Sequence, residues 1–237
     1  MRLSAPIFRL KRKAKVLSRH IDIPLSAALD RIAQEEGFQS WSHLAAKADR
    51  RTPARRLLHS FAPGGLVLIG ARPGHGKTLL ALEILTEARA AGRAGYVFSL
   101  EMTEDQARRH LENLHAKPQE TSGRLVLDTS EAICAAHIVA RTKDAEPGTV
   151  VVVDYLQLLD QRRSHPDLDR QLADLEAAAR QRGLVLVLLS QIDRSFERAP
   201  RALPDIGDIR LPNPADLTRF SRFCFLHQGE IRVDSAA

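Results

Sequence analysis

The sequence predicts an α/β protein with a mostly parallel sheet, helices on both faces of that sheet, and a small basic helical segment in front of it. Two patterns carry this prediction. From Gly64 onward, short apolar runs alternate with longer stretches of helical spacing, as in successive βαβ units. Before that point the spacing is helical, and the excess positive charge is concentrated there. We therefore expect two parts, a basic helical segment at 1–56 and an α/β domain at 57–237.

Length and composition narrow the class of protein. The chain has 237 residues, of which 44% are hydrophobic and 27% charged, and this excludes wholesale disorder. The apolar run 184–189 is far too short to span a bilayer, and basic residues interrupt the apolar residues near the start. Two cysteines, Cys134 and Cys224, make no disulfide framework. We expect a soluble cytoplasmic protein without a membrane segment.

The positive charge is unevenly distributed. Residues 1–60 hold 13 Lys/Arg against 5 Asp/Glu, whereas the remainder holds 22 against 24. Such asymmetry is typical of a segment that meets a polyanion. The alternative is a set of solvated helix faces, and it stays open. The cluster that favours contact with nucleic acid comprises Lys11, Arg12, Lys13 and Lys15.

Within the basic segment we expect three short helices. The first covers about 9–20, and Pro24 opens the second, which Gly37 ends. Ser40 precedes the third, where Trp41 is expected to join Phe38 in a small core rather than to stack on bases. Residues 49–56 are charged, contain Pro53, and are interpreted as a linker.

In the α/β domain, continuous Val/Leu/Ile runs indicate strands that are buried on both faces. Thr103 and Gln106 form a capping-box signature at the start of the second helix. Ligands of such sheets bind at the carboxyl ends of the strands. Strands are expected at 65–69, 95–99, 124–127, 149–153, 184–189 and 223–226, and helices at 78–91, 104–115, 132–144 and 168–182.

Residues 70–78 satisfy the G-x-x-x-x-G-K-[ST] pattern between a predicted strand and a predicted helix. Its glycines let backbone N–H groups curl around phosphates, and the helix N-terminus adds its positive dipole end. Lys77 is expected to contact the β- and γ-phosphates of ATP, and the Thr78 hydroxyl to ligate Mg²⁺. The side chain of His75 is free to face solvent or nucleotide. The predicted nucleotide-binding residues are Gly70, Arg72, Gly74, His75, Gly76, Lys77 and Thr78.

Three further polar residues end predicted strands or directly follow them. Asp154 closes the run 149–153, so it is expected to hold Mg²⁺ with Thr78. Glu101 follows the strand 95–99 and is a candidate to polarise the attacking water; its alternative is a helix-start glutamate. Gln191 is a candidate sensor of the γ-phosphate, and its alternative is a turn residue. Lys77, Glu101 and Gln191 are the predicted catalytic residues.

Four strings occur in one order: GARPGHGKT at 70–78, FSLEM at 98–102, VVVDYLQLL at 151–159 and LLSQIDRSFE at 188–197. In this order they resemble the ATPase domain of the DnaB-type replicative helicases, over about residues 61–228. The resemblance implies a RecA-like fold and a P-loop ATPase at 57–237. By resemblance, Glu101 matches the catalytic glutamate, Asp154 the Walker-B aspartate and Gln191 the γ-phosphate-sensing glutamine.

The resemblance also implies loops that face single-stranded DNA, after Leu159 and after Gln191. Arginines there can grip phosphates without reading sequence, although solvated loop arginines remain the alternative. Family members act as rings or filaments, so assembly with further copies or with a partner ATPase is expected. The candidate DNA-contacting arginines are Arg162, Arg163, Arg194, Arg198 and Arg201.

The sequence departs from the family pattern at both ends. Residues 1–56 stand where the family has another amino-terminal domain, and no G-K-x-R element for an arginine finger is found near the carboxyl terminus. We expect slow hydrolysis, a finger from a partner, or another arginine in that role, rather than processive unwinding. A nucleotide-gated adaptor with little turnover and a KaiC-like signalling ATPase stay open as alternatives to the DNA-dependent ATPase.

Overall fold

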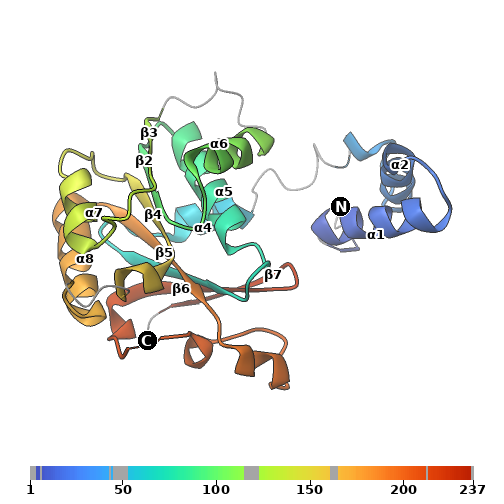
Figure 1. The fold of residues 1–237 in the computed structure, drawn as a ribbon. Helices are drawn as coiled ribbons and strands as arrows, with labels where there is room; N and C mark the ends of the chain where they lie inside the picture. The colour runs from blue at the N-terminus through green and yellow to red at the C-terminus, as the bar shows by residue number, and fades with distance from the viewer. Residues whose placement is uncertain are drawn as a thin grey trace. The chain divides into compact units, whose positions relative to one another are not determined.

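The computed structural model describes residues 4–5, 7–42, 44, 53–114, 123–160, 165–211 and 213–235 (Figure 1). The chain divides into two compact units, Met1–Thr52 and Pro53–Ala237. Within the described residues, no helix combines the length and the apolar character that crossing a bilayer requires.

The first unit is built on two helices, α1 (Ile7–His20) and α2 (Leu25–Glu35). Pro24 caps the start of α2, and Gly37 follows its end with a positive φ of 82°, the backbone conformation that glycine adopts most readily. The N–H of Trp41 donates to the Asp30 carboxylate at 2.8 Å. The small core consists of Leu10, Ala14, Ala28, Ile32, Ala33, Phe38 and Leu44, with Trp41 packed against it.

The second unit begins with α4 (Pro53–Ser60), so the interpretation of 49–56 as a linker is wrong for its last four residues. Proline is tolerated in the first turn of a helix, where its missing N–H has no intrahelical partner. Ala54, Leu57 and Leu58 recur at helical spacing and are buried, and this packing holds the helix.

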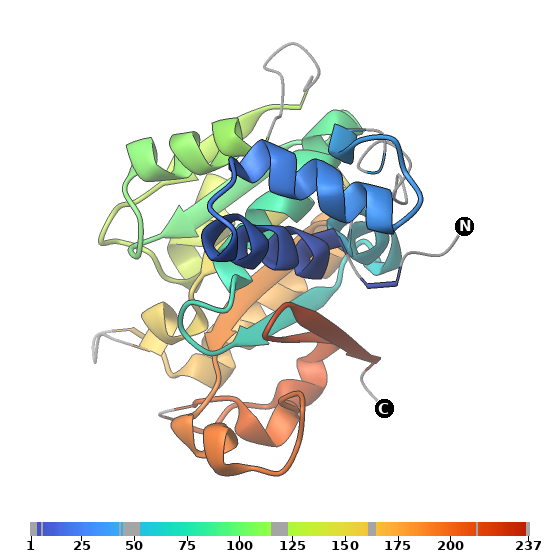
Figure 2. The same ribbon diagram turned by 90° about the vertical axis from the view of Figure 1, so that its right-hand side faces the viewer.

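A seven-stranded sheet forms the centre of this unit, in the order β3-β2-β4-β5-β1-β6-β7. All neighbouring strands run parallel except the last pair, β6 and β7, which form the antiparallel hairpin coloured red in Figure 2. The predicted RecA-like α/β fold is confirmed. The strands are β1 (Leu66–Ala71), β2 (Gly95–Ser99), β3 (Leu125–Asp128), β4 (Val150–Asp154), β5 (Val185–Gln191), β6 (Phe220–His227) and β7 (Glu230–Ser235).

Two hydrophobic layers cover the two faces of the sheet (Figure 1). One layer packs α4, α5 (Lys77–Ala90) and Leu111 of α6 (Glu104–Asn113) against strand residues that include Val67 and Cys224. The other packs α7 (Ala135–Arg141) and α8 (Leu168–Arg182) against the alternate strand residues, among them Leu66 and Phe223. Because both faces are buried, the strands read as continuous apolar runs.

Local signals account for most helix ends. The predicted capping box of Thr103 and Gln106 is present in both directions at the start of α6. Helix α7 is shorter than the expected 132–144. The N–H of Ala135, its first residue, donates to the side chain of Gln171, and the Thr142 hydroxyl donates to the Ile138 carbonyl at its end.

Candidate nucleotide-binding site

The sheet brings four strand ends together at one edge. In the register of β2 and β4, Ser99 lies beside Asp154, and in that of β1 and β5, Ala71 lies beside Gln191. Glu101 comes two residues after β2, and its N–H donates to the Ser99 hydroxyl at 3.1 Å. Since β4 lies between β2 and β5, side chains that follow all four strands converge at this edge.

The loop between β1 and α5 has the backbone that phosphate binding requires. Gly74 and Gly76 have positive φ values of 78° and 90°, and a Cβ added to either would meet nothing within 4 Å. Glycine is therefore required there by backbone conformation, and the space beside the loop is open. Gly76 caps α5 without a side-chain hydrogen bond, which leaves N–H groups of the first turn available for an anion.

Lys77 and Thr78 meet the two acidic residues. The Lys77 Nζ atom lies 2.9 Å from Glu101 Oε2 and 3.2 Å from Asp154 Oδ1. The Thr78 hydroxyl donates to Asp154 Oδ2 at 2.8 Å. Asp154 is fully buried, and Lys77 is 7% exposed. The four residues predicted to handle phosphate, metal and water therefore form one contact cluster.

Burial and charge act against each other in this cluster. Burial alone would lower the pKa of Lys77, but Asp154 and Glu101 outweigh it, so the pKa of the ammonium is raised. Burial raises the pKa of the Asp154 carboxyl, more than Lys77 and the Thr78 hydroxyl lower it. Without Lys77, the Asp154 charge would lose the cation that compensates its burial.

The donor set fits a magnesium–triphosphate complex. Thr78 supplies a hydroxyl and Asp154 a carboxylate, the oxygen ligands that Mg²⁺ accepts, with further positions left for water and phosphate. Within the part of the chain that the structure describes, no group of three or more His, Cys, Asp or Glu forms a metal cage. A sparse protein shell of this kind suits Mg²⁺ that arrives with its phosphates.

Gln191, the predicted sensor, is the half-buried last residue of β5. Its carbonyl accepts from the N–H of Arg210 at 2.9 Å. Nearby, the buried Gln157 donates to the Ser190 hydroxyl at 3.1 Å and to the Arg210 carbonyl at 2.5 Å. Gln157 thus ties the segment after β4 to the end of β5.

Two side chains of the predicted nucleotide-binding loop contact other loops. Arg72 donates through Nη1 to the Ile192 carbonyl at 3.0 Å and through Nε to Glu197 at 2.8 Å. His75 stacks on His227 with ring centroids 4.7 Å apart, and its Nδ1 accepts from the N–H of Gln228 at 3.2 Å. Gly70 lies within β1, where a Cβ would come 3.0 Å from the side chains of Ile192 and Phe225.

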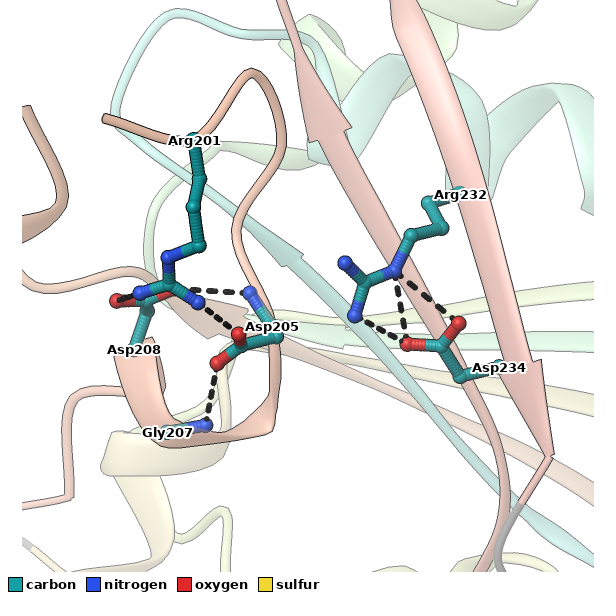
Figure 3. Close-up of polar contacts among 6 residues, drawn as sticks. All are labelled: Arg201, Asp205, Gly207, Asp208, Arg232 and Asp234. Atoms are coloured by element: carbon teal, nitrogen blue, oxygen red, sulfur yellow. Dashed lines mark hydrogen bonds and ion pairs between the residues drawn. The ribbon is translucent and has the colours of Figure 1, made fainter. Parts of the chain in front are cut away.

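The candidate DNA-contacting arginines after β5 differ in their surroundings. Arg194 and Arg198 lie on the short helix η2 (Arg194–Arg198), are exposed, and form no hydrogen bond with the residues that the structure describes. Arg201 instead pairs with Asp205 and, at 2.9 Å, with Asp208 (Figure 3). Figure 3 also shows Arg232 paired with Asp234 on β7. The candidates after β4, Arg162 and Arg163, lie outside the described residues.

The candidate cations of α1 also fall into two groups. Lys11, Arg12 and Lys15 are exposed, and α1 contains no acidic residue. Lys13 is exposed as well, but its Nζ lies 2.6 Å from Glu35 of α2. The first three lie around the same face of the helix, opposite the buried Leu10 and Ala14.

Sequence reasoning missed three residues beside the nucleotide-binding loop. Glu197 holds Arg72, His227 stacks on His75, and Phe196 makes an edge contact with His227 at 5.0 Å between centroids. Each of these contacts joins segments that are distant in the sequence. No local pattern marks such pairs.

A parallel sheet with a glycine-lined loop, a Lys-Thr pair opening a helix, and a buried aspartate at the end of a neighbouring strand defines the P-loop ATPases. Residues 32–208 match the family model described as the AAA domain, which is well over half of the chain. The chain belongs to the AAA domain family.

Curated relatives identify the type of ATPase. The replicative DNA helicase DnaB of Helicobacter pylori is 29% identical over 204 residues, which is 71% of this chain and 42% of the relative. The DnaB protein of Geobacillus stearothermophilus is 27% identical over 205 residues, covering 71% and 45%. The chain thus spans less than half the length of these relatives. They confirm the resemblance to a DnaB-type helicase ATPase domain, which covers part of the chain.

Two solved structures share the fold. One, an isolated ATPase domain, has a TM-score of 0.58 at 20% identity, covering 79% of this chain and 80% of its own. A DnaB-like replicative helicase, solved in a study of its interactions with primase, has a TM-score of 0.61 at 17% identity, covering 97% and 71%. At these identities the likeness concerns the fold alone.

Proposed function

We propose that the chain binds ATP with Mg²⁺ at this site, hydrolyses the ATP, and couples hydrolysis to contact with single-stranded DNA. One observation carries the proposal: Lys77 lies between Glu101 and Asp154, while Thr78 contacts the same aspartate. This is the set of groups that phosphate, metal and attacking water need, at the strand edge where ligands of parallel sheets bind.

Each residue has a separate task in this proposal. Lys77 leaves the two carboxylates and binds phosphate oxygens, and Thr78 and Asp154 hold Mg²⁺. When bound, Mg²⁺ neutralises charge on the phosphates. Gln191, at the end of β5, is the proposed γ-phosphate sensor.

Glu101 changes its partner in the same step. In the present arrangement its carboxylate is engaged by the Lys77 ammonium. Once Lys77 turns to phosphate, Glu101 is free to orient a water and to accept its proton. Nucleotide binding itself therefore prepares the general base.

DNA contact is proposed at two places. Arg194 and Arg198 are exposed on η2 and form no ion pair with the described residues, which suits sequence-independent contact with phosphates. Lys11, Arg12 and Lys15 form a basic face on α1, whereas Arg201 and Lys13 are already held by carboxylates. Arg162 and Arg163 remain candidates from sequence.

Assembly with further copies or with a partner ATPase belongs to the same proposal. The DnaB relatives carry the name of replicative helicases. P-loop ATPases often receive a catalytic arginine in trans, worth about 10³–10⁵ in rate. We propose that such an arginine comes from a neighbour, and that unwinding is not processive without it.

ATP turnover, measured with and without single-stranded DNA and with and without EDTA, tests the proposal when molar mass is measured in parallel. DNA-stimulated, EDTA-sensitive turnover by an oligomer is expected. Tight ATP binding without turnover under any of these conditions would instead identify a nucleotide-gated DNA-binding protein. Absence of ATP binding would refute the site altogether.

A further inference from the structure

The loop that follows β5, residues 192–211, is fastened to the nucleotide-binding loop at its first residue. The N–H of Ile192 donates to the Ala71 carbonyl at 3.1 Å, and the Ile192 carbonyl accepts from Arg72 Nη1 at 3.0 Å. Two consecutive residues at the start of the nucleotide-binding loop therefore hold both backbone groups of Ile192. This post-β5 loop carries Arg194 and Arg198, the proposed contacts to DNA.

A second attachment lies five residues further on. Arg72 Nε donates to Glu197 Oε1 at 2.8 Å, and the Arg72 side chain is only 13% exposed although Glu197 is 57% exposed. An isolated surface ion pair contributes little. Here, however, the same guanidinium is anchored on the buried Ile192 carbonyl, so its orientation toward Glu197 is largely set before the pair forms.

The ring of contacts closes through aromatic side chains. Phe196, beside Glu197 on η2, is buried and meets the edge of His227 with centroids 5.0 Å apart. His227 stacks on His75 at 4.7 Å, and the N–H of Gln228 donates to His75 Nδ1. Arg72 and His75 therefore tie the two ends of the glycine-containing turn to η2, one directly and one through the β6–β7 hairpin.

We infer that Glu197 is a positioning residue that couples the nucleotide-binding loop to the DNA-contacting arginines. Arg72 and His75 carry no phosphate-binding task in this arrangement. A shift of the loop on binding nucleotide must move or break the Arg72–Glu197 contact, and Glu197 lies on η2 between Arg194 and Arg198. The inference rests on the proposed function, because it takes the occupants of the two sites to be ATP and DNA.

Coupling of this kind is reciprocal and is measured as a ratio of affinities. For the full-length chain, the dissociation constant of a fluorescent ATP analogue is determined without DNA and with saturating oligothymidylate. We expect the two values to differ by roughly fivefold or more in the natural protein. In Glu197→Ala, the affinity without DNA should be unchanged, because Glu197 touches no predicted nucleotide-binding group except Arg72, while the ratio should approach one.

Two further variants separate coupling from general damage. Glu197→Gln keeps an oxygen that can accept from Arg72 and should retain part of the ratio. Asp174→Ala removes another exposed ion pair, with Arg170 on α8, and should behave like the natural protein. Thermal unfolding of each variant confirms that the exposed substitutions leave the fold intact.

The outcomes are distinct. A natural-protein ratio of one, or an unchanged ratio in Glu197→Ala, would overturn the inference while ATP and DNA binding stand. An equal loss in Asp174→Ala would also overturn it, because the effect would then not be specific to Glu197. A natural protein that binds no ATP analogue would refute the proposed function itself, and the inference with it.

Discussion

The ammonium of Lys77 lies 2.9 Å from the carboxylate of Glu101, so the two residues proposed to handle phosphate and water neutralise each other before nucleotide arrives. Asp154 completes the cluster from the buried side. The arrangement stores the groups needed for hydrolysis in mutual contact. It also makes their individual contributions measurable, because each substitution alters the partners that remain.

Lys77→Ala should abolish ATP binding and lower stability. The substitution leaves the buried Asp154 carboxylate without its cation, which costs about 3–5 kcal/mol in the free energy of unfolding when a buried pair is broken from one side. Denaturant unfolding and ATP titration check both effects. The cost should be smaller when Asp154→Asn is already present, since no buried charge then remains. Lys143→Ala, at an exposed lysine just after α7, is the control.

Glu101→Gln should bind ATP but turn it over about 10²–10⁴ times more slowly, because glutamine cannot accept a proton from water. Its affinity for ATP should be equal to or tighter than that of the natural protein, since Lys77 gives up one ion pair fewer. Single-turnover hydrolysis and equilibrium titration measure the two quantities. Glu104→Gln, in the exposed first turn of α6, should leave both unchanged. Full activity of Glu101→Gln would assign Glu101 to the helix start instead.

Acid should destabilise the second unit partly through His75. Burial, followed by the nearby His227 and Arg72, lowers the pKa of His75, against the smaller opposing effect of Glu197. The folded state therefore favours the neutral ring, and the unfolded chain takes up the proton first. Stability is fully present above the ordinary pKa of about 6.5 and is lost as the pH falls through the lower folded-state pKa.

Unfolding of His75→Gln, followed between about pH 5 and 8, should show a shallower loss toward acid than the natural protein. His20→Gln, at the exposed end of α1, provides the matched control. Parallel pH profiles for the natural protein and His75→Gln would contradict the prediction.

Arg194→Ala and Arg198→Ala should each reduce the salt dependence of binding to single-stranded DNA. Every lost phosphate contact lowers the slope of log K against log salt by about 0.7 for a single strand. Arg201→Ala should instead loosen the turn that Asp205 and Asp208 form, and leave the slope unchanged. Binding isotherms at several salt concentrations distinguish the three variants. A reduced slope only in Arg201→Ala would reverse the assignment.

On α1, Lys11→Ala and Lys15→Ala should lower the same slope more than Lys13→Ala does. Lys13 must give up its contact with Glu35 before it can meet a phosphate, whereas the other two are exposed without such a partner among the described residues. Equal effects of all three would show that the charge of the helix acts as a whole.

The sequence predicted most of the sheet because strands buried on both faces appear as continuous apolar runs. The edge strand β7 was missed, since it alternates apolar and charged residues and pairs antiparallel with β6. The start of α4 was missed for another reason: Pro53 and its charged neighbours resemble a linker locally. Helical packing is revealed only when Ala54, Leu57 and Leu58 meet the sheet.

The chemistry of the candidate site was predictable in the same uneven way. Lys77, Thr78 and Asp154 belong to spacings that bind phosphate and metal, so pattern alone places them together. The partners of Arg72 and His75 were not predictable, because Glu197 and His227 reach them across the fold. Arg201 looked like its neighbours in sequence, and only its pairing with Asp205 and Asp208 sets it apart.

Cys224, in the middle of β6, has a consequence for observing this protein. Burial raises the pKa of its thiol to about 12, and its side chain is fully enclosed between the sheet and its helical layer. Alkylating reagents should therefore modify only Cys134 while the core is closed. A second adduct, detected by mass, would count each excursion in which the sheet comes apart. The natural chain thus carries its own clock for such openings, and a bound nucleotide should slow it.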